Sequence, residues 1–400
     1  MKLKHSIGAI FIVSGTTIGA GMLGMPPATG YIGFIPAIIA FIVCWLIMLV
    51  SAYFFLDVNL SIKGEVNLIS MSRHTLGIGG QALSWVCYLL LLYTLTAAYI
   101  AGSAPLFQSL IEFLFHRSLP NWLSFFALPC LFGGFVYLGT LGVDLINRLL
   151  IVGLILSYLL LTGFLPKHLD LALLSYINFK PMLLALPLII AAFGYHIVIP
   201  SLTTYLQHDR KKLRRILLIG SLLPLVIYVL WELFVLGIVP LEGRFSLSQA
   251  WINGQSATYP LTHIITTPWI KTGASCFAFF AITTSFLGVT LSLSDFLTDG
   301  FKIKKSWEGR LLAFLLTFVP PLIFVFTYPQ GFLIALNYAG ALVAILLIFL
   351  PSLMAWQLKH SRFYQSIGGR ILFVSIILFS ILIVASVILQ QIGLLTPFTF

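Results

Sequence analysis

The chain has 400 residues, of which 60% are hydrophobic and only 8% are charged, whereas about a quarter of the residues in an ordinary soluble domain are charged. This composition excludes a water-soluble fold and predicts an all-α integral membrane protein, because apolar runs of about 20 residues recur along the chain and each can cross ~30 Å of hydrocarbon. The formal net charge of +11 does not indicate nucleic-acid binding, since the basic residues lie between apolar runs rather than on one soluble face.

Eleven transmembrane helices are expected from the apolar runs. The first run is too long for the hydrophobic segment of a signal peptide, so we interpret it as an uncleaved helix. A hydropathy window of about 19 residues places the eleven helices near residues 6–28, 32–56, 81–106, 122–141, 149–166, 181–206, 213–239, 271–297, 310–327, 331–356 and 370–395.

The basic residues predict the orientation of these helices. Cytoplasmic segments of membrane proteins carry an excess of Lys and Arg. The densest basic run, 210–215, is interpreted as a cytoplasmic topology anchor that anionic lipid would also attract. With a cytoplasmic N-terminus and an external C-terminus, only five of the 22 basic residues lie outside: Arg117, Lys167, Lys180, Arg244 and Lys271.

Two of the expected helices contain sequences that do not favour a continuous helix. The first contains GTTIGAGMLGMP at 15–26, and the sixth contains FGYHIVIPS at 193–201. Within lipid, an interrupted backbone is tolerated only where it faces protein, a cavity or a ligand. The interruptions lie five helices apart, and an odd number of helices inverts the second unit relative to the first. We therefore expect inverted repeats at 1–180 and 181–360, with an additional helix and a short external C-terminus at 361–400.

The interrupted helices can supply both poles of a site for a free α-amino acid. We expect unpaired amides at the start of the second half of the first helix, where a carboxylate binds, and free carbonyls near Ile18 and Phe193, which accept from an ammonium group. The amides are those of Ala20, Gly21 and Met22. The glycines also fit close helix packing, which is the alternative interpretation. The full set of candidate substrate-binding residues is Thr16, Thr17, Ile18, Gly19, Ala20, Gly21, Met22, Phe193, Gly194, Tyr195 and His196, with Tyr93 and Tyr99 from the third helix as aromatic candidates.

Ionisable residues inside the expected helices are candidates for moving a proton, because a charge within the bilayer is costly. The candidates are His196, Glu232 and Asp295. Each has a structural alternative: His196 as a neutral imidazole bound to substrate or backbone, Glu232 as a hydrogen-bonded acid, and Asp295, with Asp299 one turn later, as a partner of basic residues at the cytoplasmic end.

Two further groups bear on coupling and gating. Asp144 and Arg148 are four residues apart and are expected to form a structural ion pair at the inner gate. The hydroxyls of Thr283, Thr284 and Ser285, with carbonyls of the first interruption, leave a sodium site open as the rival to a proton.

The sequence predicts neither a metal nor a cofactor, and it does not favour an enzyme. The aspartates at 295 and 299 are faintly similar to a prenyltransferase motif, but the second aspartate-rich segment that such enzymes need is missing, and so is the phosphate-binding loop of an ATP-driven pump. The cysteines have no metal-binding or disulfide spacing, so we interpret all four as buried small hydrophobic residues: Cys44, Cys87, Cys130 and Cys276.

Six long motifs carry a resemblance to a known family: SGTTIGAGML at 14–23, YTLTAAYIAG at 93–102, VDLINRLL at 143–150, FGYHIVIPSL at 193–202, LRRILLIGSLLPLVIYVLW at 213–231 and FLGVTLSLSDFLTDG at 286–300. With these motifs in this order, the chain resembles the hydroxy and aromatic amino acid permease family, which includes tyrosine-specific and tryptophan permeases. That family belongs to the amino acid, polyamine and organocation superfamily.

The resemblance implies a fold and a function. The fold is the five-plus-five inverted repeat of the leucine transporter type plus one helix, with helices one and six broken. The function is import of Tyr, Trp or Phe by proton symport with alternating access, by a monomer in the bacterial cytoplasmic membrane. Sodium coupling or exchange is the alternative. Glu232 departs from the family pattern, in which a neutral Gln is expected after the Trp.

Overall fold

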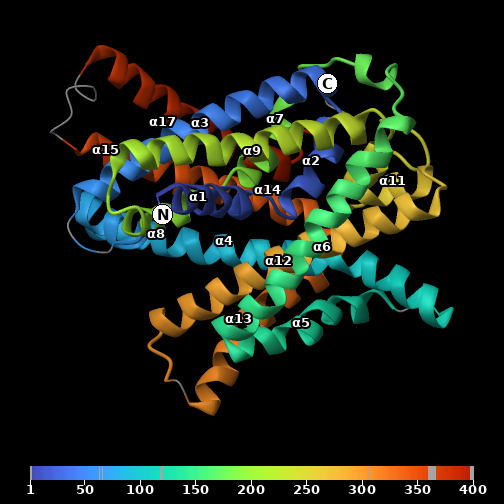
Figure 1. The fold of residues 1–400 in the computed structure, drawn as a ribbon, viewed down its shortest axis with the longest axis horizontal. Helices are drawn as coiled ribbons and strands as arrows, with labels where there is room; N and C mark the ends of the chain where they lie inside the picture. Colours follow the sequence, from blue (N-terminus) through green and yellow to red (C-terminus); the bar gives the residue numbers. More distant parts are fainter. Residues whose placement is uncertain are drawn as a thin grey trace.

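The computed structural model describes residues 2–62, 64, 66–117, 120–304, 306–358 and 366–396, and within these ranges the chain forms helices and no strands (Figure 1). The all-α prediction is confirmed. The helices are α1 (Lys2–Thr17), α2 (Gly21–Thr29), α3 (Phe34–Ser61), α4 (Leu68–Phe115), α5 (Asn121–Leu138), α6 (Thr140–Phe164), α7 (Met182–Ala192), the short η3 (His196–Val198), α8 (Ile199–Tyr205), α9 (Arg210–Leu236), α10 (Leu247–Ile252), α11 (Thr258–Ile264), α12 (Pro268–Gly300), α13 (Trp307–Thr327), α14 (Gly331–Val343), η4 (Ala344–Phe349), α15 (Leu350–Trp356) and α17 (Ile367–Gln391).

Nine helical segments of the described chain are long and apolar enough to cross a membrane, and the bent pair α1–α2 makes up to ten. The fourth expected span corresponds to α5, whose apolar part, Trp122–Leu138, is shorter than the others. The third expected span begins earlier than predicted, because α4 starts at Leu68 and passes through a kink at Gly77, where φ is +74°. The count of eleven spans therefore stays a prediction.

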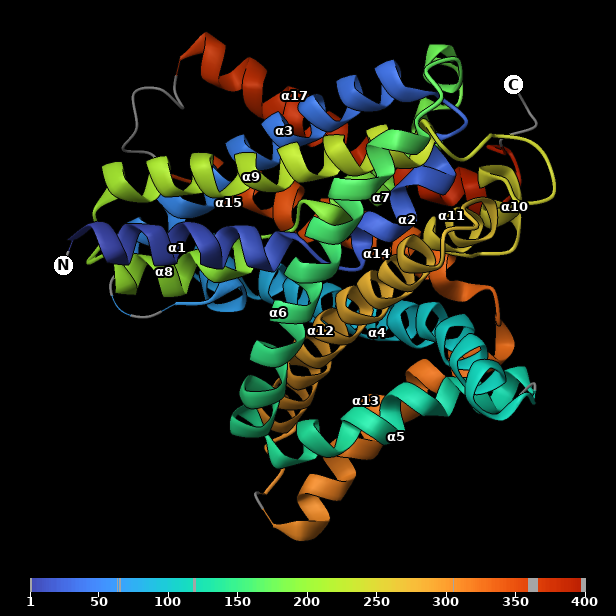
Figure 2. The ribbon, with the colours of Figure 1, turned by 45° about the vertical axis from the view of Figure 1, so that its right-hand side comes forward.

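The helices pack in two groups. The helices α1, α3 and α9 lie side by side along the long axis of the molecule, and α7 and α14 pack with them. The helices α5 and α13 lie on the far side of α4, and α6 and α12 cross between the groups (Figure 2). The starts of α1 and α9 lie at one end of the molecule, and α17 ends toward the other.

Hydrophobic side chains cover the outside as well as the core. On α6 alone, Val152, Leu156 and Leu159 are all more than half exposed, as expected where lipid rather than water is the neighbour. For this reason the prediction that all four cysteines are buried is wrong: Cys130 is exposed and Cys276 is only partly buried. Apolar character alone does not tell lipid-facing positions from core positions in a membrane helix.

An ion cluster around the buried Asp57 carboxylate ties α3 to α9 where the basic run begins. Asp57 has a side chain that is 5% exposed, and its Oδ2 lies 2.7 Å from Arg210 Nη2 and 3.0 Å from Arg214 Nη2. The Arg214 guanidinium also lies over the Tyr53 ring, 5.4 Å from its centre. Part of the basic run therefore has a partner in the fold, which the interpretation as a topology anchor did not foresee. Four of the basic residues that the orientation prediction places in the cytoplasm lie outside the described residues: Lys63, Lys305, Lys359 and Arg362.

We expect Asp57→Asn to lower the free energy of unfolding by about 1–2 kcal/mol, because it leaves two neighbouring cations without their carboxylate, while their exposure of 55% and 43% limits the loss. The matched control is Asp209→Asn. Asp209 is charged, since a hydrogen bond from the Lys212 side chain lowers its pKa, but it lies at the surface and Asn keeps its cap on α9. Denaturant unfolding that finds the two variants equally stable would contradict the structural role of Asp57.

A close helix contact makes a second prediction. A Cβ atom on Gly340 of α14 would collide with the carbonyl oxygen of Pro187 on α7, a backbone atom that cannot turn away. We expect Gly340→Ala to lower the melting temperature by several degrees. Gly288→Ala on α12, where a Cβ meets nothing within 4 Å, should leave the melting temperature unchanged or raise it, because Ala favours a helix. Equal melting temperatures would show that α7 and α14 approach less closely than described.

Candidate functional site

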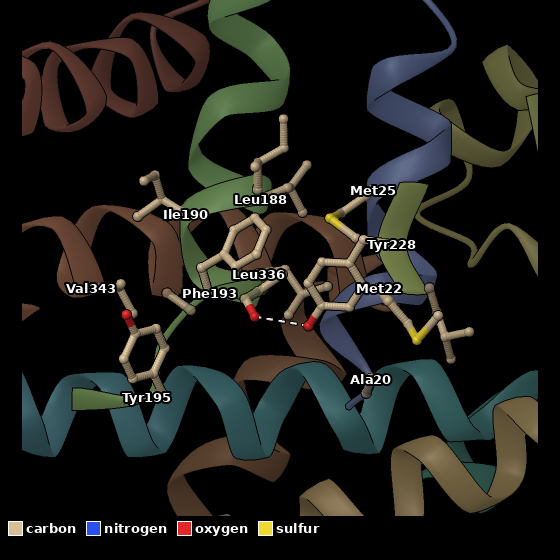
Figure 3. Close-up of a cluster of buried hydrophobic side chains, with 14 of the residues drawn as sticks. Ala20, Met22, Met25, Leu188, Ile190, Phe193, Tyr195, Tyr228, Leu336 and Val343 are labelled. Atoms are coloured by element: carbon tan, nitrogen blue, oxygen red, sulfur yellow. Dashed lines mark hydrogen bonds between the residues drawn. The ribbon is translucent and has the colours of Figure 1, made fainter. Parts of the chain in front are cut away.

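The two predicted helix interruptions lie next to each other. The helix α1 ends at Thr17 and α2 begins at Gly21 with a bend of 54°, while α7 ends at Ala192 and the chain becomes helical again at His196. Both carbonyl groups that end these helices meet one side chain of α9. The hydroxyl of Tyr228 lies 2.6 Å from the carbonyl oxygen of Thr17 and 2.9 Å from that of Ala192. Figure 3 shows Tyr228 beside Phe193 and α2.

Glycine and proline explain where the helices stop. A Cβ on Gly19 would lie 2.6 Å from the Ser285 Oγ, so only glycine allows the interruption to approach α12 this closely. The amide of Ala20 donates to the same Oγ at 3.1 Å. Pro200 occupies the first turn of α8, where its missing N–H costs nothing.

The amides at the start of α2 are less free than the sequence suggested. Ala20 donates to Ser285, and Met22 donates to the carbonyl of Gly19 at 3.2 Å, because short-range bonds tighten the first turn of a helix. Among the described residues, the amide of Gly21 is the one of the three without a partner. The predicted set of three unpaired amides is thus reduced to one.

The helix α9 is hydrogen-bonded to both halves of the interrupted first helix. The Ser14 hydroxyl donates to the carbonyl of Gly220 at 2.8 Å, and Trp231 Nε1 donates to the carbonyl of Met22 at 3.0 Å. The sequence analysis missed Tyr228 and Trp231. The available signal was their polar atoms, which need partners when the rings are buried, together with their spacing of three residues on one helix face.

Aromatic and sulfur-containing side chains surround the interruptions. Phe193 packs edge-on against Tyr228 with ring centres 5.2 Å apart, and Trp231 lies 5.2 Å from Phe277. Met22 and Met25 line the side of α2 (Figure 3), and these four rings and two thioethers are all buried. Such surroundings are suited to holding an aromatic group.

The other predicted site residues divide by position. The segments 17–22 and 193–196 lie at the interruptions, whereas Thr16 is exposed and its hydroxyl donates to Ile12. Tyr99 is buried on α4 near Ser285. Tyr93 lies apart from the interruptions, because its hydroxyl donates to the carbonyl of Leu316 on α13 at 2.9 Å.

Two buried polar side chains at the second interruption lack partners. His196 is fully buried, and neither ring nitrogen has a hydrogen-bond partner among the described residues. The Tyr195 hydroxyl is in the same condition, and the two rings lie 5.1 Å apart. Buried polar atoms are normally hydrogen-bonded, so these groups are available to water or a ligand.

Glu232, one residue after Trp231, is fully buried and contacts α2. Its Oε2 lies 2.9 Å from the Thr29 hydroxyl, and its Oε1 has no partner among the described residues. The Thr29 hydroxyl also lies 3.1 Å from the carbonyl of Met25 and 3.4 Å from that of Pro26. The single proton of the Thr29 hydroxyl therefore has three possible acceptors.

The remaining charged candidates lie at the surface of the protein. Asp295 is exposed near the end of α12. Asp144 and Arg148 form an ion pair of 2.7 Å on α6, with side chains 54% and 77% exposed.

The hydroxyls considered for sodium are partly occupied by other hydrogen bonds. Thr284 donates to Phe280 of its own helix, and Ser285 accepts from Ala20. Thr283 is buried without a partner among the described residues. In that part of the chain, no group of three or more His, Cys, Asp or Glu side chains is arranged to hold a metal ion.

Comparison with known proteins points to transporters. Residues 2–387 match the Tryptophan/tyrosine permease family. The chain is 32% identical to a tryptophan-specific transport protein of Haemophilus influenzae, covering 100% of this chain and 99% of that protein. It is also 32% identical to tyrosine-specific transport system 1 of the same organism, covering 82% of each. Among solved structures, a manganese transporter of Eremococcus coleocola has a similar fold, with a TM-score of 0.58 at 16% identity over 97% of this chain and 92% of that one.

The contact at Gly19 can be tested by compensation. We expect Gly19→Ala to lower the melting temperature, because the new methyl group clashes with the Ser285 hydroxyl at 2.6 Å. Ser285→Ala alone should cost about 1 kcal/mol, the value of one hydrogen bond. The double variant should be more stable than Gly19→Ala alone, because the clashing oxygen is gone. A double variant whose losses simply add would contradict the proposed contact.

Proposed function

The chain belongs to the tryptophan/tyrosine permease family, and on that premise we propose that it imports an aromatic amino acid across the bacterial cytoplasmic membrane by proton symport with alternating access. The observation that carries the proposal is the meeting of two interrupted helices at the Tyr228 hydroxyl, within 2.6 and 2.9 Å of their last carbonyl groups. The names of the relatives as tryptophan-specific and tyrosine-specific transport proteins support the substrate class.

The proposed substrate site has two polar poles and an apolar wall. The ammonium group binds the carbonyls of Thr17 and Ala192, each one residue earlier than expected from the sequence, at the negative ends of their helices. The carboxylate binds at the amide of Gly21, at the positive end of α2. The aromatic ring lies against Phe193 and Trp231, and the unpartnered nitrogens of His196 are available to a polar atom on that ring.

The proposed membrane arrangement retains eleven spans, with α5 as the fourth. The repeats are 1–180 and 181–360, and 361–400 is an addition. The breaks after α1 and α7 support this division, because each interrupts the first expected helix of its proposed repeat. A cytoplasmic N-terminus agrees with the position of the start of α1 at the same end as the start of α9, which carries the basic run 210–215. We further propose that a monomer is sufficient for transport.

Among the three candidates for the coupling proton, the geometry favours Glu232. Burying a carboxylate without a cation costs several kcal/mol, and a bound proton removes that cost. When protonated, Glu232 donates to the Thr29 oxygen, and Thr29 donates to the carbonyl of Met25 in α2. When deprotonated, Glu232 requires the Thr29 proton, and the Met25 carbonyl loses its donor. The protonation state is thereby linked to α2, which also carries the proposed carboxylate pole.

Purified protein in liposomes tests the coupling. We expect an inward proton gradient, without sodium, to drive accumulation of labelled tryptophan or tyrosine. Glu232→Gln should abolish this accumulation and retain at least half of the counterflow of labelled for unlabelled substrate, because binding and exchange do not need the proton. Asp295→Asn, which changes an exposed carboxylate, is the control and should retain both activities.

Other outcomes would assign the coupling differently. Accumulation that requires sodium would overturn proton symport, and counterflow without accumulation under either gradient would identify an exchanger. If Glu232→Gln retains proton-driven accumulation and His196→Gln loses it, the proton is carried by His196. Absence of any flux of tryptophan, tyrosine or phenylalanine would refute the proposed substrate class.

A further inference from the structure

One tyrosine hydroxyl is shared by the ends of two helices. Tyr228 is fully buried, and its hydroxyl lies within hydrogen-bond distance of the carbonyl of Thr17, the last residue of α1, and of Ala192, the last residue of α7. The final carbonyls of a helix have no partner within the helix and carry its negative partial charge. Two such ends therefore converge on one atom.

The hydroxyl cannot satisfy both carbonyls. It has one proton, so it makes one full hydrogen bond at a time, and no other donor to either carbonyl is present among the described residues. One buried acceptor is thus always incompletely satisfied, which is unfavourable. A group with several donors and a positive charge would fit this position better.

We propose that the Tyr228 hydroxyl occupies the place of the substrate's ammonium group in the empty protein and is displaced by that group when substrate binds. The inference rests on the proposed function. An ammonium group has three N–H donors, which satisfy both carbonyls at once, and its charge is favoured by both helix ends.

The neighbouring backbone matches an α-amino acid. A Cβ on Gly21 would lie 3.5 Å from the Cα of Ala192, so the start of α2, with its unpartnered amide, lies close to the end of α7. The proposed carboxylate and ammonium poles therefore lie on neighbouring stretches of backbone, as the binding of one α-amino acid requires. An aromatic acid without an amino group lacks a donor to replace the hydroxyl, so the hydroxyl keeps its hydrogen bond when such an acid binds.

The experiment compares two ligands on two variants. Tyr228→Phe removes the competing hydroxyl, and the matched control is Tyr158→Phe on α6, whose hydroxyl donates to the carbonyl of Ile227 in α9 at 3.1 Å, away from the interruptions. The ligand pairs are tryptophan with indole-3-propionate and tyrosine with 3-(4-hydroxyphenyl)propanoate, which differ only in the amino group. Dissociation constants are measured on the purified full chain by calorimetry or by competition with labelled amino acid.

In Tyr228→Phe we expect the affinity for the amino acid, relative to its amine-free partner, to rise about three- to tenfold, because binding no longer breaks a hydrogen bond of the empty site. Tyr158→Phe should leave the ratio unchanged. A ratio that is unchanged in Tyr228→Phe would show that the hydroxyl has a structural role alone, and a ratio that falls would show that it stays in place as part of the ammonium site. Either result overturns the proposal, whereas failure of the wild type to bind any aromatic amino acid would refute the proposed function instead.

Folding of the variant does not limit the test. If Tyr228→Phe is not recovered, Tyr228→Met also removes the hydroxyl and is measured in its place. If neither variant accumulates in membranes, growth with the amino acid should restore their amount and growth with the amine-free acid should not, because only the ammonium satisfies the two carbonyls. Recovery with neither ligand, or with both equally, would contradict displacement.

Discussion

Backbone groups buried in lipid or protein must find hydrogen-bond partners, and the architecture around the two interruptions follows from this requirement. Interrupting α1 and α7 frees carbonyl and amide groups deep in an apolar molecule. Two side chains one turn apart on α9 supply the partners. Tyr228 bonds to the carbonyls that end α1 and α7, and Trp231 bonds to a carbonyl in α2. A helix that is itself continuous thus makes the interruptions possible.

This arrangement places the two proposed functional events on one short helix. The helix α2 begins at Gly21, beside the proposed carboxylate pole, and ends at Thr29, which contacts Glu232. Fewer than three turns of helix separate Thr29 from the proposed substrate site, so a change in the hydrogen bonding of Thr29 would act on that site over a short distance. The prolines within α2 remove two backbone donors, so the helix has fewer internal bonds to resist a small change in its shape.

The sequence predicted the helical class and the two interruptions, because glycine clusters and prolines inside apolar runs are local signals. It did not predict the residues that complete the site. Tyr228 meets Thr17 across 211 positions of the chain and Ala192 across 36, and such partners are determined by packing rather than by local pattern. The same reason explains Asp57, whose basic partners lie more than 150 positions away.

Other errors in the sequence analysis have local causes. The early start of α4 was missed because Arg73 and the glycines near Gly77 resemble a loop, whereas the helix continues through a kink. The exposure of Cys130 could not be seen from hydropathy, because lipid-facing and core-facing residues are equally apolar. Tyr93 and Tyr99 lie fewer than two turns apart on α4, yet only Tyr99 is near the interruptions. The hydroxyl of Tyr93 instead donates to a carbonyl of α13.

The hydrogen bonds of the interrupted first helix are unevenly divided between its neighbours. Side chains and carbonyls of α9 join it at Ser14, Thr17, Met22 and Thr29, whereas α12 joins it through the Ser285 hydroxyl at Ala20. Sliding α9 past this helix would break four of these bonds, and sliding α12 would break one and would carry Ser285 across a glycine. In mechanical terms, side-chain hydrogen bonds couple α1 and α2 more strongly to α9 than to α12, so displacement along α12 would meet less resistance from such bonds.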